Sequence, residues 1–134
     1  MKEIAANPHA EVAWYFTETR EQFRLAGKLD IVDASSHNEE LNKTRQGQWS
    51  YMSDALRQQF TWPEPGQPVA TDPEAWTRPA PSKEEIPDEF VLLVLNVEEV
   101  EYLLLGDPHR KVHYIRNAAG REGAPEWAEA PVNP

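Results

Sequence analysis

The two histidines in the segment DPHRKVHY, residues 107–114, come closest to a chemical motif by type and spacing. A histidine can ligate a metal ion or exchange a proton near neutral pH. On a β-strand, however, His109 and His113 would share one face without converging on a single ion, and neither a further histidine nor a helical context supports a site. We therefore predict no metal site, and the residues alone favour ordinary surface or interface histidines.

Motifs of other known reactions are missing from the sequence. The chain contains no cysteine, which excludes disulfides, thiolate metal ligands and cysteine nucleophiles. It also lacks a glycine-rich phosphate loop, a G-x-S-x-G nucleophile elbow and an H-E-x-x-H metalloprotease signature. No single motif in this sequence assigns a reaction.

A second group of polar residues lies in WYFTETREQFRLAGKL, residues 14–29. Phe23 and Leu25 fall on one parity of this segment, and Gln22 and Arg24 fall on the other. Such alternation is typical of a β-strand with one apolar and one polar face. The polar face is either the hydrated side of a sheet or the wall of a ligand site.

The elements that would position these residues are mainly strands. Alternation predicts an antiparallel hairpin from 12–16 and 22–32, joined by a polar reversal and preceded by a short helix at 2–6. Further along the chain, apolar segments predict strands within 90–97, 100–105, 110–116 and 125–134, with a turn at 106–108 and a hairpin loop at 117–123. The strand at 90–97 is expected to be covered on both faces.

Two helices are predicted between these strand regions. Ser36 and Glu39 have capping-box spacing, which predicts the start of the first helix. A stripe of apolar residues predicts one continuous second helix, and it comprises Trp49, Met52, Leu56 and Phe60. The stripe places Trp49 in the core, and Arg57 can form an ion pair with Asp54 one turn earlier.

Residues 61–87 are predicted to form a proline-rich arm. Seven prolines occur between Pro63 and Pro87, too many for a helix or a central strand. Trp62 and Trp76 in this stretch suggest an arm pinned against the body of the protein. Together the elements predict a mainly β (α+β), barrel-like domain with two inserted helices.

Size and charge narrow the range of partners. The chain has 134 residues and a formal net charge of −10, with 23 acidic and 13 basic residues. No basic stripe is visible, so we expect no nucleic-acid binding. The longest apolar run, Phe90 to Leu95, is too short to cross a bilayer, and the first residues form no secretory signal. We therefore expect a cytoplasmic protein with no membrane partner.

Three segments in a distinctive order resemble a known family. They are NPHAEVAWYFTETREQFRLAGKL, RQGQWSYMSDALRQQFTWPEPGQP and FVLLVLNVEEVEYLLLGDPHRKVHY. They are similar to the second part of a pyridoxamine 5′-phosphate oxidase-like flavin-binding protein, in particular of its bacterial and plant FMN-binding subgroup. The similarity covers almost the whole chain.

This resemblance implies a Greek-key-like FMN-binding split β-barrel over residues 1–134, which dimerises and holds FMN in grooves built by both subunits. In the oxidase a hydride passes from the substrate to the flavin, so the implied activity is that of an FMN-dependent oxidoreductase. The implied cofactor contacts are Gln22, Ser53, Arg24 and Lys111. The implied substrate contacts are His109 and Arg110. Arg24 is equally suited to an ion pair across the strands with Glu11 or Glu18.

The family's N-terminal strands bind the flavin phosphate, and we expect them to be absent from this chain. A barrel without them would expose an apolar face, with Val12, Trp14, Phe23 and Leu25 as candidates. The chain would then be a truncation, be completed by another polypeptide, or form a homodimer that covers the face. We favour the homodimer.

Two classes of function follow from the sequence. The first is an FMN-dependent oxidoreductase. The second is a non-catalytic dimeric binding module or subunit that has lost the FMN phosphate site. A third possibility, haem with His109 or His113 as axial ligand, is less favoured.

Overall fold

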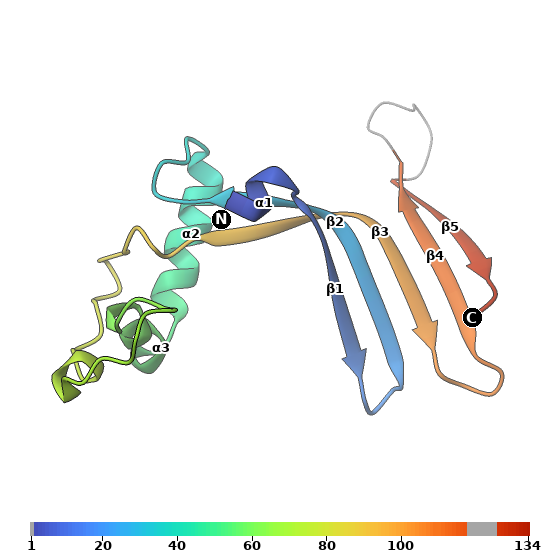
Figure 1. Ribbon diagram of the computed structural model, residues 1–134. Coiled ribbons are helices and arrows are strands. Elements are labelled where there is room, and N and C mark those ends of the chain that lie inside the picture. The colour runs from blue at the N-terminus through green and yellow to red at the C-terminus, as the bar shows by residue number, and fades with distance from the viewer. Residues whose placement is uncertain (1, 118–125) are drawn as a thin grey trace. The chain divides into compact units, whose positions relative to one another are not determined.

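The computed structural model describes residues 2–117 and 126–134. In these residues the chain forms one five-stranded antiparallel sheet in the order β1-β2-β3-β4-β5, with helices inserted in the sequence between β2 and β3 (Figure 1). The chain divides into two compact units. The sheet unit comprises Met1–Asp30 with Val94–Pro134, and the helical unit comprises Ile31–Leu93.

The sheet follows most of the predicted strands. Its elements are α1 (Lys2–Ala6), β1 (His9–Phe16), β2 (Glu21–Val32), β3 (Leu92–Leu104), β4 (Arg110–Arg116) and β5 (Trp127–Val132). The predicted short helix, the hairpin and the last two strands are confirmed. The prediction of separate strands at 90–97 and 100–105 is wrong, because no glycine or proline interrupts the single strand β3. The predicted loop at 117–123 lies, apart from Asn117, outside the described residues.

The N-terminal part of β3 also differs from the prediction. Leu93 is 45% exposed, so this segment is not covered on both faces. At the level of Gly27, the backbones of β2 and β3 approach closely. A Cβ atom on Gly27 would lie 2.0 Å from the carbonyl oxygen of Asn96, so only glycine fits without a backbone shift.

One face of the sheet carries a row of aromatic side chains, here called the aromatic face. It comprises Trp14, Phe16, Phe23 and Tyr102. Successive ring centroids along this row are 5.2, 5.9 and 5.0 Å apart. Trp14 is 56% exposed and Val12 is 44% exposed, which confirms an exposed apolar surface on β1. Phe23 and Leu25 are half-buried.

The helical unit begins differently from the prediction. It contains α2 (Glu39–Tyr51), α3 (Asp54–Gln58) and two short 3₁₀ helices, η1 (Gln59–Thr61) and η2 (Pro73–Trp76). Asn38 caps α2, because its side chain accepts a hydrogen bond from the Leu41 N–H at 3.1 Å. The hydroxyl of Ser36 instead accepts from the Asn38 N–H, so the predicted capping box is wrong.

The apolar stripe that predicted one helix spans two helices and a 3₁₀ turn. The backbone becomes extended at Met52, and Ser53 then caps α3. A serine hydroxyl competes for backbone N–H groups, which makes this position a better cap than a helix interior. The core assignment of Trp49 is confirmed, since it is fully buried and its ring centroid lies 5.2 Å from those of Phe60 and Phe90.

The proline-rich arm is fixed to the helices through its carbonyl groups. Proline has no N–H, so the arm offers many acceptors and few backbone donors. The donors are side chains of α2 and α3: Arg45 to Phe90 and Pro87, Trp49 to Ser82, Ser50 to Lys83, Arg57 to Pro81, and Gln58 to Arg78. The arm is therefore pinned, as predicted, and Trp62 packs on Trp76 within it.

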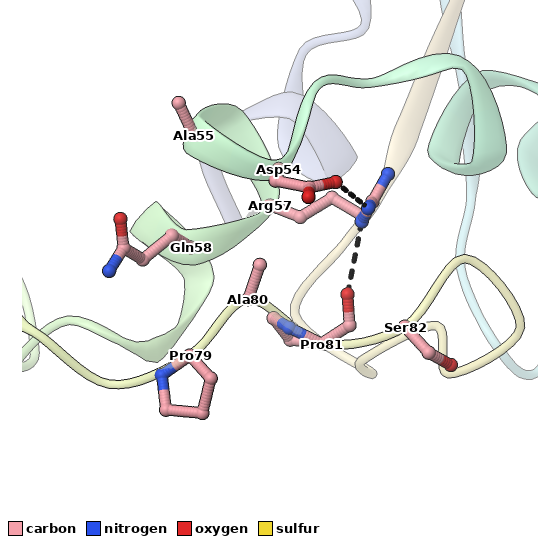
Figure 2. Close-up of a pocket in the computed structure, with 8 residues that line it drawn as sticks. All are labelled: Asp54, Ala55, Arg57, Gln58, Pro79, Ala80, Pro81 and Ser82. Atoms are coloured by element: carbon pink, nitrogen blue, oxygen red, sulfur yellow. Dashed lines mark hydrogen bonds and ion pairs between the residues drawn. The ribbon is translucent and has the colours of Figure 1, made fainter.

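Arg57 shows how this attachment works in detail. Its side chain is almost fully buried, and Figure 2 shows the guanidinium between the Asp54 carboxylate and the Pro81 carbonyl. It also donates to the Met52 carbonyl where α2 ends. The predicted Asp54–Arg57 ion pair is confirmed.

None of the described helices is long and apolar enough to cross a membrane.

Candidate functional site

The polar face of the sheet is the side opposite the aromatic face. It comprises Glu11, Gln22, Arg24, Glu99, Glu101, Lys111 and His113, and this set is here called the polar face. The register places Arg24 opposite Ala13 on β1, and places Lys111 and His113 opposite Leu103 and Glu101 on β3. Alternation along each strand then brings three predicted cofactor contacts to one surface: Gln22, Arg24 and Lys111.

Both cations among the predicted cofactor contacts, Arg24 and Lys111, already form ion pairs with carboxylates. Arg24 donates from Nε and Nη2 to one oxygen of Glu11 at 2.8 and 2.6 Å. Glu101 lies between the two cations, 3.6 Å from the Arg24 guanidinium and 3.1 Å from Lys111 Nζ. The cross-strand pair of Arg24 with Glu11, one of the alternatives that the sequence left open, is thus present.

These contacts shift the titration of the charged groups. The hydrogen bond from Lys111 holds the pKa of the Glu101 carboxyl below its usual range. The hydrogen bond with Glu11 raises the pKa of Arg24 further above neutrality. Both shifts favour the charged forms, so the chain of ion pairs persists through neutral pH. On the same face, Nε2 of His113 lies 3.4 Å from a Glu99 oxygen.

Gln22 differs from its neighbours because its side chain is uncommitted. It is half-buried, and no other residue in the described part of the chain hydrogen-bonds to its amide. A primary amide carries two N–H donors and one carbonyl acceptor. The amide of Gln22 is therefore a neutral group able to both donate and accept, beside cations that are already paired with carboxylates.

The predicted substrate contacts do not join this surface. Arg110 is the first residue of β4 and is adjacent to Lys111, so alternation points the two side chains to opposite faces. His109 precedes the strand and is exposed, with Nδ1 2.6 Å from the Gly106 carbonyl oxygen. A carbonyl only accepts, so Nδ1 carries the proton and Nε2 of the neutral ring is left as an acceptor. The described residues contain no cluster able to hold a metal ion.

Ser53 belongs to the helical unit and has a local role there. Its hydroxyl accepts a hydrogen bond from the Leu56 N–H at 3.3 Å, which caps α3. Arg45 in the same unit is also committed, because its guanidinium donates to the carbonyls of Phe90 and Pro87 at 2.8 and 3.0 Å.

The sequence did not predict a short hydrogen bond between β2 and β3. The Tyr102 hydroxyl donates to Glu21 at 2.7 Å at the end of the aromatic face. Hydrogen bonds from Thr19 and then from Tyr102 lower the pKa of Glu21, and the same bond to Glu21 raises the pKa of Tyr102. The signals available were Glu21, an acid at the start of the apolar parity row of β2, and a tyrosine within the corresponding row of β3.

Comparison with known proteins connects this arrangement to one family. Residues 1–33 match the family described as pyridoxamine 5′-phosphate oxidase, FMN-binding domain. The chain is 31% identical over 137 residues to pyridoxine/pyridoxamine 5′-phosphate oxidase 2 of Arabidopsis thaliana, covering 100% of this chain and 67% of that protein.

Solved structures give the same result. A pyridoxamine 5′-phosphate oxidase-related FMN-binding protein of Nostoc punctiforme superimposes with a TM-score of 0.88 and 36% identity, over 99% of this chain and 66% of that one. PhzG of Burkholderia lata, in complex with tetrahydrophenazine-1-carboxylic acid, gives 0.66 at 16% identity, over 99% and 62%, and shows the fold alone. The predicted split-barrel class is confirmed, and the chain spans about two thirds of the length of these relatives.

Proposed function

Because the chain belongs to the pyridoxamine 5′-phosphate oxidase-like family of FMN-binding proteins, we propose that it is a flavoprotein whose polar face contacts the flavin. The observation that carries the proposal is the uncommitted amide of Gln22 on a surface whose charged side chains are paired. A flavin ring has a polar edge with both donors and acceptors, which a primary amide can match.

The fit to the rest of FMN is uneven. A phosphate requires several cationic or N–H donors that are not already compensated. Arg24 and Lys111 share Glu101, and Arg24 is also bonded to Glu11, so the polar face carries no excess of positive charge. These residues fit the ring and the ribityl hydroxyls, and they do not fit the phosphate.

We assign the phosphate donors to the part of the relatives' length that this chain does not match. They would be supplied on the same polypeptide or on a completing one. Arg24 and Lys111 then act mainly by holding β1, β2, β3 and β4 together around Gln22. Ser53 remains a proposed flavin contact. Its hydroxyl oxygen uses one lone pair to cap α3, and the second lone pair is available to a ligand.

The proposed activity is oxidoreduction, in which bound FMN accepts a hydride from the substrate. Within this chain, Gln22 would bind and orient the ring. His109 would take part on the substrate side, because Nδ1 contacts the Gly106 carbonyl oxygen and Nε2 is left to interact with a substrate. Arg110 would attract an anionic substrate group, since it is exposed and makes no ion pair with another described residue.

We further propose a homodimer that associates through the edge strand β1 and the aromatic face. The support is the aromatic face, where Trp14 and Val12 keep large exposed apolar areas on the edge strand β1. Such a surface favours association, because covering it removes apolar area and an unpaired strand edge from water.

The ion pairs of Arg24 and Lys111 with carboxylates support an alternative function. In this alternative, the chain is a non-catalytic dimeric binding module that no longer recognises the FMN phosphate. The two functions differ in whether the flavin ring binds at all.

The test is a titration of the purified chain with FMN and, in parallel, with riboflavin, followed by flavin fluorescence and by elution from a sizing column. We expect both flavins to bind with similar affinity to a dimer. Gln22→Ala should weaken both by about tenfold, the loss of one or two neutral hydrogen bonds. Gln46→Ala, an exposed glutamine on α2, is the matched control and should leave both affinities unchanged.

Each other outcome has a definite meaning. FMN bound more than tenfold tighter than riboflavin would place the phosphate donors in this chain and overturn their assignment elsewhere. Absence of binding by either flavin would contradict the flavoprotein proposal and support the non-catalytic module. An unchanged affinity in a folded Gln22→Ala variant would remove Gln22 from the site.

A further inference from the structure

The helical unit contains a groove of about 970 Å³ that is distinct from the polar face. Its apolar lining is dominated by three aromatic side chains, Phe60, Trp62 and Trp76, which are 38, 42 and 39% exposed. The volume is within the range of small-molecule sites in proteins. Exposed tryptophan is unusual outside binding surfaces, so this groove has the features of a ligand site.

Two indole rings form a corner in this groove. The ring centroids of Trp62 and Trp76 are 5.8 Å apart, and the ring planes meet at 65°. The indole Nε1 of Trp76 lies 3.5 Å from the Ala70 carbonyl oxygen, at the long limit of a hydrogen bond. The π-face of an indole is electron-rich, so a group that lies in this corner against the rings is favoured if it carries positive charge.

The walls of the groove are held in place before any ligand binds. The segment Glu64–Gln67 forms a turn, in which the Gln67 N–H donates a hydrogen bond to the Glu64 carbonyl. Pro65 is the second residue of the turn, and Gly66, the third, has a φ of +82°. This is the sequence pattern of a type II turn. The helix η2 that carries Trp76 is capped by the Asp72 side chain, which accepts from the Glu74 N–H at 3.0 Å.

Phe60 connects the groove to the core of the same unit. Its ring packs against Trp49 at 5.2 Å and against Phe90 at 5.7 Å between centroids. A site whose walls are already ordered loses less entropy when a ligand binds. The groove is therefore suited to a small rigid group.

The charge of the groove is negative. Two carboxylates, Glu64 and Glu89, line it, and neither makes an ion pair with another described residue. Among the residues that the structure describes, no lysine, arginine or histidine lines it. Aromatic walls alone would accept any apolar molecule, whereas aromatic walls with two unpaired carboxylates select a cation.

We propose that this groove binds a small organic cation, an alkylammonium compound, between Trp62 and Trp76, with Glu64 and Glu89 providing the opposite charge. The apolar substituents of the ammonium group pack on the rings, and the positive charge interacts with the ring faces and the carboxylates. None of the residues that line this groove is among the proposed flavin contacts.

The test compares choline with its neutral isostere, in which a tert-butyl group replaces the trimethylammonium group. Isothermal titration calorimetry of the full chain should show saturable choline binding. The isostere should bind at least about tenfold more weakly, since it keeps the shape and loses the charge. Equal binding of the two compounds would mean an apolar site and would overturn the proposal, as would absence of choline binding.

Variants locate the site and separate binding from folding. Trp76→Ala should abolish choline binding, and the double variant Glu64→Gln with Glu89→Gln should weaken it severalfold while keeping the shape of the groove. Tyr51→Ala, which removes a 93% exposed aromatic side chain that does not line the groove, is the matched control and should bind choline as the parent does. A folded glutamine double variant that binds choline unchanged, with melting temperature equal to the parent's, would contradict the charge argument.

Discussion

The guanidinium of Arg24 donates two hydrogen bonds to a single carboxylate oxygen of Glu11 across the β1–β2 pair, at 2.8 and 2.6 Å. Its remaining nitrogen faces Glu101 on β3 at 3.6 Å, and Glu101 in turn bonds to Lys111 on β4. One row of alternating charges therefore ties four strands together. This row explains why a surface with two cations has little positive charge to offer to a phosphate.

Replacement of Glu101 by glutamine should change what the polar face can bind. The variant Glu101→Gln keeps the size of the side chain and releases Lys111 and part of Arg24 from compensation. We expect the preference for FMN over riboflavin to rise about threefold or more, as expected for one partly solvated charge. Because the pair is only partly buried, the unfolding free energy should fall by no more than about 1 kcal/mol.

The measurement is the ratio of the two dissociation constants, which cancels any effect on the ring itself. Glu98→Gln, which removes a different exposed carboxylate on β3 paired with Lys28, is the matched control. A ratio that stays constant in Glu101→Gln would show that Glu101 does not set the charge seen by the phosphate.

Acid should weaken the sheet through Glu101. Its pKa in the folded protein lies below the ordinary value of 4.5, chiefly through the hydrogen bond from Lys111. A group with a lowered folded pKa stabilises the fold above its unfolded pKa, and the contribution is lost as pH falls through the folded pKa. Stability should therefore be level near neutrality and decline below about pH 4.5.

Urea titrations at a series of pH values check this decline. In Glu101→Gln the slope of unfolding free energy against pH below that point should be smaller than in the parent. Glu21 contributes with the same sign, since its pKa is also lowered, so the slope should not vanish. A slope identical in the two proteins would exclude Glu101 as a source.

The sequence predicted the two faces of the hairpin correctly, because side-chain alternation is a local property of a strand. It offered Glu11 as a partner for Arg24 for the same reason, since a hairpin register follows from a short turn. Glu101 and Tyr102 could not be identified as partners of β2. Their contacts depend on β3 lying next to β2, although residues 33–91 separate the two strands in sequence.

Predictions for the helical unit failed where polar side chains decide the structure. The stripe from Trp49 to Phe60 has helical spacing, yet the Ser53 hydroxyl ends one helix and begins another. Burial of Arg45 and Arg57 follows from the carbonyl-rich arm, because guanidinium groups supply donors that prolines lack. Apolar patterning treats arginine as a surface residue and so does not predict this.

Trp49 should be the most sensitive position in the helical unit. Its ring is fully buried between Phe60 and Phe90, and its indole N–H donates to the Ser82 carbonyl at 3.0 Å. Trp49→Ala should lower the unfolding free energy by about 3–5 kcal/mol through the cavity it leaves. Trp49→Phe should lower the unfolding free energy by less, because it keeps an aromatic ring in the core. The remaining cost is the Ser82 carbonyl, which loses its hydrogen-bond donor.

Chemical denaturation followed by circular dichroism measures both changes. Tyr51→Ala on the same helix is the control, because this side chain is 93% exposed and its loss should be close to neutral. A loss below about 1 kcal/mol in Trp49→Ala would contradict the core assignment.

Ser53 offers a way to separate a structural role from a role in flavin binding. Its hydroxyl caps α3, so Ser53→Ala should lower the unfolding free energy by about 1 kcal/mol. Ser53→Asp should restore stability, because aspartate is an equally good cap and its charge suits a helix N-terminus.

If capping is the only role of Ser53, flavin affinity should be the same in the parent and in both variants. If the hydroxyl also contacts FMN, the stable Ser53→Asp variant should bind FMN more weakly than riboflavin, because the new carboxylate repels the phosphate. Flavin titrations at a temperature where all three proteins are folded distinguish these results, and equal affinities would withdraw Ser53 from the proposed cofactor site.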